Sequence, residues 1–250
     1  MTQSLYKFLY DIAIIEVALV NRVADKVFHN EYEVKFSEDL RNDMLTVIID
    51  EAYHAYVALD FIEQTKNTSK IVPVIVPTET QLTQAVKQIK SNLDEDTAKI
   101  FELIAVCIAE NSITKELVSL SNEKELNQAF YHILSDHMLD EGRHNGIFTH
   151  VLEFFWFYLE APTKEIIKKT IPVFIELYLD NDMQKAYDKE VLYNLNFTEE
   201  SINTIIDDTY LKQDLRVLLK NNSAAKNIIK LLQRCGVMSE DEIKHFYNAN

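Results

Sequence analysis

Glutamate and histidine residues recur in this sequence at spacings that suit metal ligands on helices. Glu51 and His54 form one Glu-x-x-His unit, Glu141 and His144 form a second, and His137 lies one turn upstream of Glu141. Because residues three or four apart lie on the same side of a helix, each unit can direct a carboxylate and an imidazole at one ion. A single unit of this kind is more often a solvated helix face, so the prediction of metal binding depends on what accompanies it.

Each unit is preceded by a further glutamate inside an apolar, helix-forming stretch. Glu16 lies 35 residues before Glu51, in YDIAIIEVALV, and Glu110 lies 31 residues before Glu141, in ELIAVCIAENSIT. Carboxylates are rarely buried in apolar surroundings without a partner. A Glu…Glu-x-x-His pattern that occurs twice is the ligand set of a carboxylate-bridged di-metal site in a four-helix bundle. The sequence therefore predicts seven metal ligands, namely Glu16, Glu51, His54, Glu110, His137, Glu141 and His144.

An aspartate directly precedes the glutamate of each unit, as Asp50 and Asp140. A histidine that binds a metal usually donates its other ring N–H to a carboxylate or carbonyl oxygen. We expect Asp140 to accept from His54 and Asp50 to accept from His144, across the site. Four glutamates and three histidines favour iron, with manganese as an alternative occupant, over zinc, whose structural sites are mostly four-coordinate cages of Cys and His.

Composition favours an all-α protein. The 250 residues include only three Gly and four Pro, too few turn formers for a sandwich, a barrel or a doubly wound sheet. Glycine-rich phosphate loops are absent, which argues against most nucleotide-dependent functions. The net charge of −15 makes nucleic acid and anionic membranes unfavourable partners, and the longest apolar clusters are too short for a membrane span. We expect neither kind of partner.

Cysteine usage and the N-terminal residues predict a cytoplasmic protein. Cys107 and Cys235 are the only cysteines and have no Cys-x-x-Cys spacing, which fits a reducing compartment. The first residues, MTQSLYKFLYD, lack the basic and apolar regions of a secretory signal.

Helical periodicity and capping residues predict one domain of 250 residues with two parts. A ferritin-like four-helix bundle over about 3–160 would hold the metals, and additional C-terminal helices would follow over about 163–250. The apolar segment KIVPVIVPTET has two prolines and should be an extended crossover. Expected helices of the bundle part are 3–29, 37–64, 79–91, 94–119 and 122–160, and those of the extension are 163–180, 182–194, 198–208, 211–220, 223–234 and 239–248.

Two glycines lie inside the expected helix at 122–160, as Gly142 and Gly146. Each costs a helix about 1 kcal/mol relative to Ala. We therefore expect another helix or a ligand to approach closely at these positions.

The ligand pattern resembles that of the p-aminobenzoate N-oxygenase (AurF-like) family of di-iron proteins. Ferritin-like oxygenase and reductase subunits generally carry one histidine per Glu-x-x-His unit, whereas this family adds a third one turn upstream of the last unit, as His137 does here. The resemblance covers all seven predicted ligands over about residues 10–145, and IIKLLQRCGVM is a weaker match to the closing helix of the family. The chain is shorter than typical members.

The resemblance implies an enzyme that uses two iron ions and O2 to oxygenate the nitrogen of a primary amine in small-molecule biosynthesis. A ferredoxin or reductase would donate electrons, and a homodimer is compatible with the sequence. Thr114, four residues after Glu110, stands where related di-iron monooxygenases place a proton-handling threonine, although such a residue more often only bonds the carbonyl four residues before it. The implied substrate pocket lies one turn from Glu16 and Glu110 and would be lined by Phe8, Ile12, Leu19, Val20, Ile113 and Leu117.

Two other functions remain open on the sequence alone. The same ligands could serve a di-iron hydroxylase or oxidase that acts on carbon, because the ligand pattern does not determine which bond is attacked. A non-enzymatic iron-binding or iron-storage protein is a further alternative, but the long C-terminal extension does not suit a shell-forming storage protein.

Overall fold

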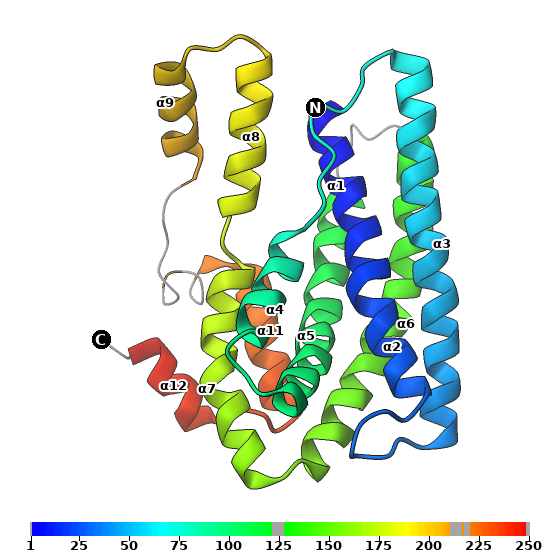
Figure 1. Ribbon diagram of the computed structural model, residues 1–250. Helices are drawn as coiled ribbons and strands as arrows, with labels where there is room; N and C mark the ends of the chain where they lie inside the picture. The colour runs from blue at the N-terminus through cyan, green and yellow to red at the C-terminus, as the bar shows by residue number, and fades with distance from the viewer. Residues whose placement is uncertain (1, 122–127, 211–216, 218–220, 249–250) are drawn as a thin grey trace.

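The computed structural model describes residues 2–121, 128–210, 217 and 221–248, with side chains at all of these except 113–121, 128–129 and 245–248. Four long helical segments form a bundle, and shorter helices pack along one side of it (Figure 1). The expected all-α fold is confirmed, since the described residues contain no strand. The four segments of the bundle are α1 (Thr2–Ile15) with η1 (Glu16–Val20) and α2 (Asn21–Phe28), α3 (Glu38–Ser69), α5 (Glu95–Ser121) and α6 (Gln128–Tyr158).

The first of these segments is one continuous helical stretch with a π-helical turn in its middle. The turn, η1, begins at Glu16, and the backbone N–H of Asn21 bonds the Glu16 carbonyl five residues before it. The sequence predicts one helix over 3–29 with no change of pitch, because no glycine or proline marks this turn. Single π turns inside α-helices are rare and are frequently found at functional sites.

Local capping explains where α3 begins and ends. The Ser37 hydroxyl accepts from the backbone N–H of Leu40, which satisfies one of the donors at the start of the helix. The helix ends at Lys70, whose φ of 61° is left-handed and stops the helical repeat. It runs to Ser69, about a turn beyond the expected end near residue 64.

The expected crossover after α3 is irregular, as predicted from its prolines. The side chain of Gln3 holds it to α1, because its amide nitrogen donates to the Val72 carbonyl and its amide oxygen accepts from the Val74 N–H, both at 2.9 Å. Thr80 and Thr83 then form a reciprocal capping box that starts α4 (Gln81–Lys90).

The C-terminal helices α7 and α11 lie against α5, whereas α8 and α9 pack on each other beyond the end of α7, with α8 also touching α4 (Figure 1). Reciprocal hydrogen bonds between Ser239 and Glu242 start the last helix, which the sequence predicts over 239–248. The start of the expected helix at 122–160 and most of the expected helix at 211–220 lie outside the described residues. The described helices are α7 (Ala161–Tyr178), α8 (Asp182–Asn194), α9 (Glu199–Thr209), α11 (Ser223–Arg234) and α12 (Glu240–Asn248).

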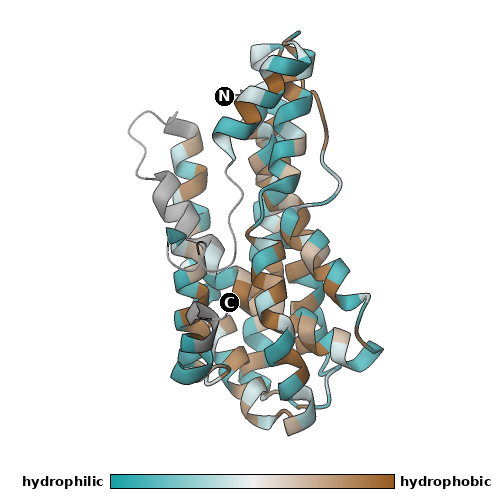
Figure 2. Cartoon of the chain, turned by 90° about the vertical axis from the view of Figure 1, so that its left-hand side faces the viewer, coloured by the Kyte–Doolittle hydropathy of each residue, from teal (hydrophilic) through white to brown (hydrophobic). Residues whose placement is uncertain are grey.

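The bundle contains two apolar clusters, one on either side of the predicted ligands. The larger one joins buried residues such as Val20, Phe101 and Phe148, and the smaller one consists of Tyr6, Leu9, Ala58, Ile62, Phe130 and Leu134. Burying one such large side chain contributes about 1.5–3 kcal/mol. Apolar and polar residues alternate around the helices, as amphipathic packing requires (Figure 2). The predicted ligands therefore form a polar layer between two apolar ones.

The expected close approach at Gly142 and Gly146 is absent. An added Cβ atom would meet no heavy atom within 4 Å at either position among the described residues. Both glycines lie on the exposed side of α6, so no neighbouring helix in the described part of the chain requires them. Packing at this helix does not explain why glycine stands there.

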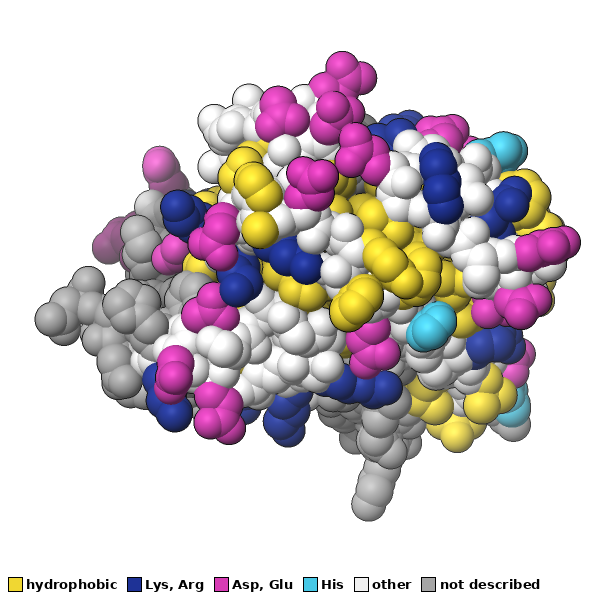
Figure 3. Space-filling model, turned by 90° about the horizontal axis from the view of Figure 1, so that it is seen from below, with side chains coloured by type: hydrophobic (Ala, Val, Ile, Leu, Met, Phe, Trp, Pro, Cys, Tyr) yellow, Lys and Arg dark blue, Asp and Glu magenta, His cyan; other side chains and the backbone are white. Residues whose placement is uncertain are grey.

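On the surface seen in Figure 3, acidic and basic side chains are interspersed with scattered apolar ones. No helix in the described part of the chain combines the length and the apolar character needed to cross a bilayer.

Candidate metal centre

The structure brings all seven predicted ligands together in the middle of the bundle. Their ligand atoms fall into two groups, within each of which all atoms lie within 4.8 Å of one another. Glu51 and Glu141 belong to both groups. Each of the seven residues is at most 6% exposed, so the carboxylates and imidazoles here are removed from water. The first group is Glu16, Glu51, His54, His137 and Glu141, and the second is Glu51, Glu110, Glu141 and His144.

Two imidazoles face the first group from different helices. His54 Nδ1 lies 3.2 Å from Glu51 Oε2 and 3.8 Å from Glu16 Oε2. His137 Nε2 lies 3.1 Å from both Glu16 Oε1 and Glu141 Oε1. The two rings stack with centroids 3.9 Å apart, so both nitrogens point into the same small space. This half of the cluster is richer in nitrogen than the other.

The second group contains buried atoms that lack a hydrogen-bond partner among the described residues. His144 Nδ1 and Glu51 Oε1 lie 3.0 Å apart, yet neither makes a hydrogen bond to a described residue. In the first group, Glu16 Oε2 is likewise buried and makes no hydrogen bond to a described residue. Buried polar atoms without a partner cost about 1–3 kcal/mol each. Cations between these atoms would satisfy all three. Four glutamates would also balance the charge of two divalent ions, so the residues present fit a di-metal group.

The electrostatics of the cluster agree with this fit. Burial, together with the neighbouring carboxylates, raises the pKa values of Glu16 and Glu110 well above their usual range. Burial also acts to raise the pKa of Glu141, but the neighbouring imidazoles of His137 and His144 outweigh it and lower that pKa to about 2. Burial acts to lower the pKa of His144, but the nearby carboxylates of Glu141 and Glu51 raise that pKa to about 11. In the absence of cations, protons on Glu16, Glu110 and His144 therefore offset the repulsion between the buried carboxylates.

Two aspartates lie behind the imidazoles, in the crossed arrangement expected from the sequence. The Nε2–H of His54 donates to Asp140 Oδ2 and that of His144 donates to Asp50 Oδ2, each at 3.1 Å. These bonds leave Nδ1 of both rings free to face the cluster. One nitrogen of Arg143 donates to both aspartates, which ties the two arrangements together. The role of the aspartates behind metal ligands stays a prediction.

A cavity of about 290 Å³ reaches the cluster at Glu16. Phe8 and Ile12, two of the predicted pocket residues, line it. A second, much smaller cavity of about 60 Å³ adjoins His54 and His137 on the other side of Ile12. The larger cavity is wide enough for a small ligand and lies at the lower end of ligand-site volumes.

Neither Leu19 nor Val20 lines this cavity. Val20 is fully buried in the larger apolar cluster, and Leu19 lines a separate hollow beside Arg22. The physical reason is that side chains pack tightly on only one side of Glu16 along the bundle axis. Packed side chains occupy the space on the C-terminal side of Glu16, and the cavity lies on its N-terminal side.

The other three predicted residues of the site, Ile113, Thr114 and Leu117, are in α5, but their side chains lie outside the part of the chain that is described. The proton-handling role of Thr114 therefore stays a prediction.

The C-terminal extension contributes residues to the cavity that sequence reasoning missed. Tyr178, at the end of α7, lines the cavity, and its hydroxyl lies 2.8 Å from that of Ser112 in α5. Ser112 is buried two residues after Glu110. Asn181 and Asn222 also line the cavity from the extension. No motif marks these residues, because they approach the site only through the packing of α7 and α11 on α5.

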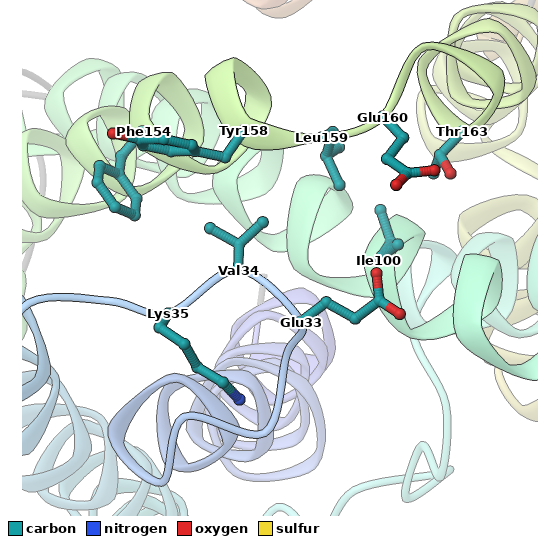
Figure 4. A pocket seen from close by; sticks show the side chains of 9 residues that line it. All are labelled: Glu33, Val34, Lys35, Ile100, Phe154, Tyr158, Leu159, Glu160 and Thr163. Carbon is teal, nitrogen blue, oxygen red and sulfur yellow. The ribbon is translucent and has the colours of Figure 1, made fainter.

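Figure 4 shows another hollow, of about 470 Å³, at the end of the bundle remote from the cavity. It is lined from the loop after α2 and from the junction of α6 and α7, and none of the seven predicted ligands lines it. The ammonium of Lys35 donates to the backbone carbonyls of Asn30 and Tyr32, so this charge serves to hold the loop. The hollow is separate from the metal centre.

The long helices of this four-helix bundle direct four glutamates and three histidines into two ligand groups, and the two groups share two residues. These features define a di-metal carboxylate protein of the ferritin-like kind. Residues 12–221 match the family described as P-aminobenzoate N-oxygenase AurF. This match covers most of the chain, and the chain belongs to that family, which confirms the resemblance seen in the sequence.

The chain is also similar to a 4-aminobenzoate N-oxygenase of Streptomyces thioluteus. The two are 20% identical over 160 residues, which make up 64% of this chain and 48% of the relative. This chain thus spans about half the length of the curated relative that it matches.

Proposed function

We propose that this protein is a di-iron enzyme that uses O2 to oxygenate the nitrogen of a primary amine, to a hydroxylamine or onward to a nitroso or nitro product. The observation that carries the proposal is the pair of ligand groups sharing Glu51 and Glu141, with His137 as a third imidazole. Family membership supports the same chemistry, and the relative that carries the name of an N-oxygenase supports the choice of nitrogen over carbon.

The residues of the cluster would serve as ligands to two ions. Glu51 and Glu141 would bridge them, because each belongs to both groups. Glu16, His54 and His137 would complete one ion's ligands, and Glu110 and His144 the other's. Bound iron would supply the electrons and the binding site for O2 activation.

The protein around the ions would control protons and water. Asp140 and Asp50 would hold the protons of His54 and His144 on Nε2, so that Nδ1 keeps its lone pair for the cluster. The apolar clusters on both sides would keep bulk water away. The cavity at Glu16 would admit the amine and orient its nitrogen toward the centre.

The remaining requirements are also part of the proposal. Reduction of the irons calls for an external electron donor, a ferredoxin or a reductase. Manganese would be an alternative occupant, since the same oxygen and nitrogen ligands suit it. The two buried free thiols, Cys107 and Cys235, fit a reducing compartment such as the cytoplasm.

The test is turnover of a defined di-iron protein. The protein is loaded with Fe(II) under nitrogen, its iron content is measured, and it is mixed with O2 and a panel of aryl and alkyl amines. We expect about two irons per chain and N-oxygenated products that carry label from 18O2 in mass spectra.

A matched control keeps the fold and removes the centre. A Glu51→Gln, Glu141→Gln double variant should bind little iron and form no product, because both bridging carboxylates are lost. Products oxygenated only at carbon would support the carbon-directed alternative. Uptake of many irons per chain without any organic product would support storage.

A further inference from the structure

Two cavities approach the first ligand group, and Ile12 lines both of them. The larger one, of about 290 Å³, reaches Glu16, whereas the smaller one, of about 60 Å³, adjoins His54 and His137. The amine of the proposed reaction would occupy the larger cavity. The smaller one is then left without a role, although it lies against two of the seven predicted ligands.

The volume of the smaller cavity restricts its contents to very small molecules. A water molecule takes up about 30 Å³ in the liquid, and an apolar protein cavity that binds benzene has about 150 Å³. A cavity of about 60 Å³ therefore has room for a diatomic molecule or a very few waters, and it has no room for an aromatic amine.

Apolar side chains from three helices form much of the wall of the smaller cavity. Leu9, Ala58 and Leu134 are at most 3% exposed and belong to the smaller apolar cluster of the bundle. The cavity therefore lies where that cluster meets the layer of predicted ligands. Its apolar lining consists of Leu9 and Ile12 of α1, Val57 and Ala58 of α3, and Ile133 and Leu134 of α6.

The polar groups at this wall offer few hydrogen bonds to a buried water. Asp140 uses both carboxylate oxygens, since Oδ2 accepts from His54 and Oδ1 accepts from Arg143. His137 faces the carboxylates with Nε2, so its ring has at most one further N–H to offer. A buried water typically makes about two to four hydrogen bonds, whereas an apolar cavity stays dry and admits apolar gases. The wall therefore favours an apolar occupant.

One end of the smaller cavity lies at the surface and the other lies beside the cluster. Tyr53 and Asp136, which line it from α3 and α6, are both exposed to solvent. At the inner end, His54 Nδ1 lies 3.2 Å from Glu51 and His137 Nε2 lies 3.1 Å from Glu16. A small molecule in this cavity is thus one imidazole ring away from the carboxylates, and it need not pass through the larger cavity.

We propose that the smaller cavity is a binding site for O2, separate from the amine site and reached from the surface between α3 and α6. O2 is diatomic and apolar, which suits both the volume and the wall. This inference rests on the proposed function, which supplies O2 as a substrate and assigns the larger cavity to the amine. Its consequence is that a bound amine does not block the approach of O2.

Xenon is the probe for this site, because it binds in small apolar cavities and does not react. Crystals of the metal-loaded protein under xenon pressure should show xenon among Ile12, Val57 and Leu134. Ala58→Val adds two methyl groups at the buried wall and should abolish this binding. Ala52→Val makes the same change at an exposed position of α3 and should retain it. Ordered water in the cavity, with no xenon at any pressure, would overturn the proposal.

The rate at which O2 oxidises the Fe(II)-loaded protein provides the second measurement, followed by stopped-flow absorbance without amine. We expect Ala58→Val to lower the second-order rate constant for O2 by about tenfold, because the added methyl groups fill the site. Amine affinity, measured by calorimetry under nitrogen, should stay unchanged, and Ala52→Val should alter neither quantity. An O2 rate constant that Ala58→Val leaves unchanged would contradict the proposal, as would one that saturating amine lowers in the unmodified protein.

Val57→Ile provides a second route if Ala58→Val folds poorly by circular dichroism. It adds one methyl group at a half-buried position of the same wall. We expect lower xenon occupancy and an O2 rate constant reduced by about threefold. Unchanged values of both would show that O2 does not use this cavity. Neither measurement requires an oxygenated product, so a protein that fails to oxygenate amines would refute the proposed function and leave the test of this site intact.

Discussion

His137 is the residue that gives the cluster its asymmetry. It faces the carboxylates through Nε2, whereas His54 and His144 face them through Nδ1 and have aspartates behind them. Among the described residues, no comparable carboxylate is found hydrogen-bonded behind His137. We infer that its contribution depends on the ion itself more than on a supporting hydrogen bond.

Replacing His137 with Ala should therefore weaken one metal position and spare the other. We expect iron content to fall from about two per chain toward one after loading and desalting, because one of the two imidazoles of the first group is lost. Elemental analysis and circular dichroism measure the metal and the fold. His150→Ala, an exposed histidine in the same helix, is the control and should keep both irons. Full iron content in His137→Ala would remove His137 from the ligand set.

At the residue scale, spacing along helices was sufficient to predict which seven side chains meet. Glu16 and Glu110 could be singled out because a carboxylate in an apolar helical stretch is unusual. The cavity was harder to predict. Leu19 follows Glu16 by one turn as Ile12 precedes it, yet only Ile12 lines the cavity. Which side of a ligand is left unfilled depends on the packing of distant segments, and spacing does not encode that.

At the scale of elements, α6 carries two glycines that its packing does not need. Gly146→Ala should stabilise the protein by about 1 kcal/mol, because Ala is the better helix former and its Cβ atom meets no neighbour. For a chain of this size that raises Tm by about 2–4 °C. Scanning calorimetry of the metal-loaded protein measures the change.

Gly236→Ala is the matched comparison for this substitution. Gly236 follows α11 with a φ of 71°, which strains any residue that has a Cβ atom, so Ala should destabilise the protein by about 1–2 kcal/mol. A lower Tm in Gly146→Ala would mean that the glycine serves a purpose in α6 other than packing.

Most element boundaries could be predicted because caps mark them. Ser37, Thr198 and Ser239 stand at the starts of α3, α9 and α12, and their side chains make the capping bonds. The π turn at Glu16–Val20 could not be predicted. Its cause is tertiary, since the helix must direct Glu16 into the cluster while both flanking segments bury their own apolar faces.

The metal-free protein should lose stability as the pH rises from about 5 to about 8. Glu16 and Glu110 have raised pKa values, so the stability they contribute is present below about pH 4.5 and is lost as they ionise in the bundle. His144 acts in the same direction, because its contribution is present below about pH 6.5 and is lost toward its own pKa of about 11. The lowered pKa of Glu141 matters only below about pH 4.5.

Urea unfolding of the chelator-treated protein across this range measures the effect. A Glu16→Gln, Glu110→Gln double variant should flatten the dependence, since amides do not ionise. Adding divalent cations should restore most stability at the upper end of the range, where the carboxylates are ready to bind them. Metal-free protein that becomes more stable as the pH rises would contradict the assignment of these shifts to the cluster.

At the scale of the whole molecule, the polar layer between the two apolar clusters bears on folding cooperativity. With ions bound, every long helix is tied to the others at mid-length, so both ends of the bundle should unfold together. Without ions, the smaller cluster of Tyr6, Leu9, Ala58, Ile62, Phe130 and Leu134 should open on its own. Amide hydrogen exchange would then be fast in the first residues of α1, in the last turns of α3 and near Leu134, while the amides around Phe101 and Phe148 stay protected. The metal centre would thereby decide whether this chain unfolds as one cooperative unit or as two.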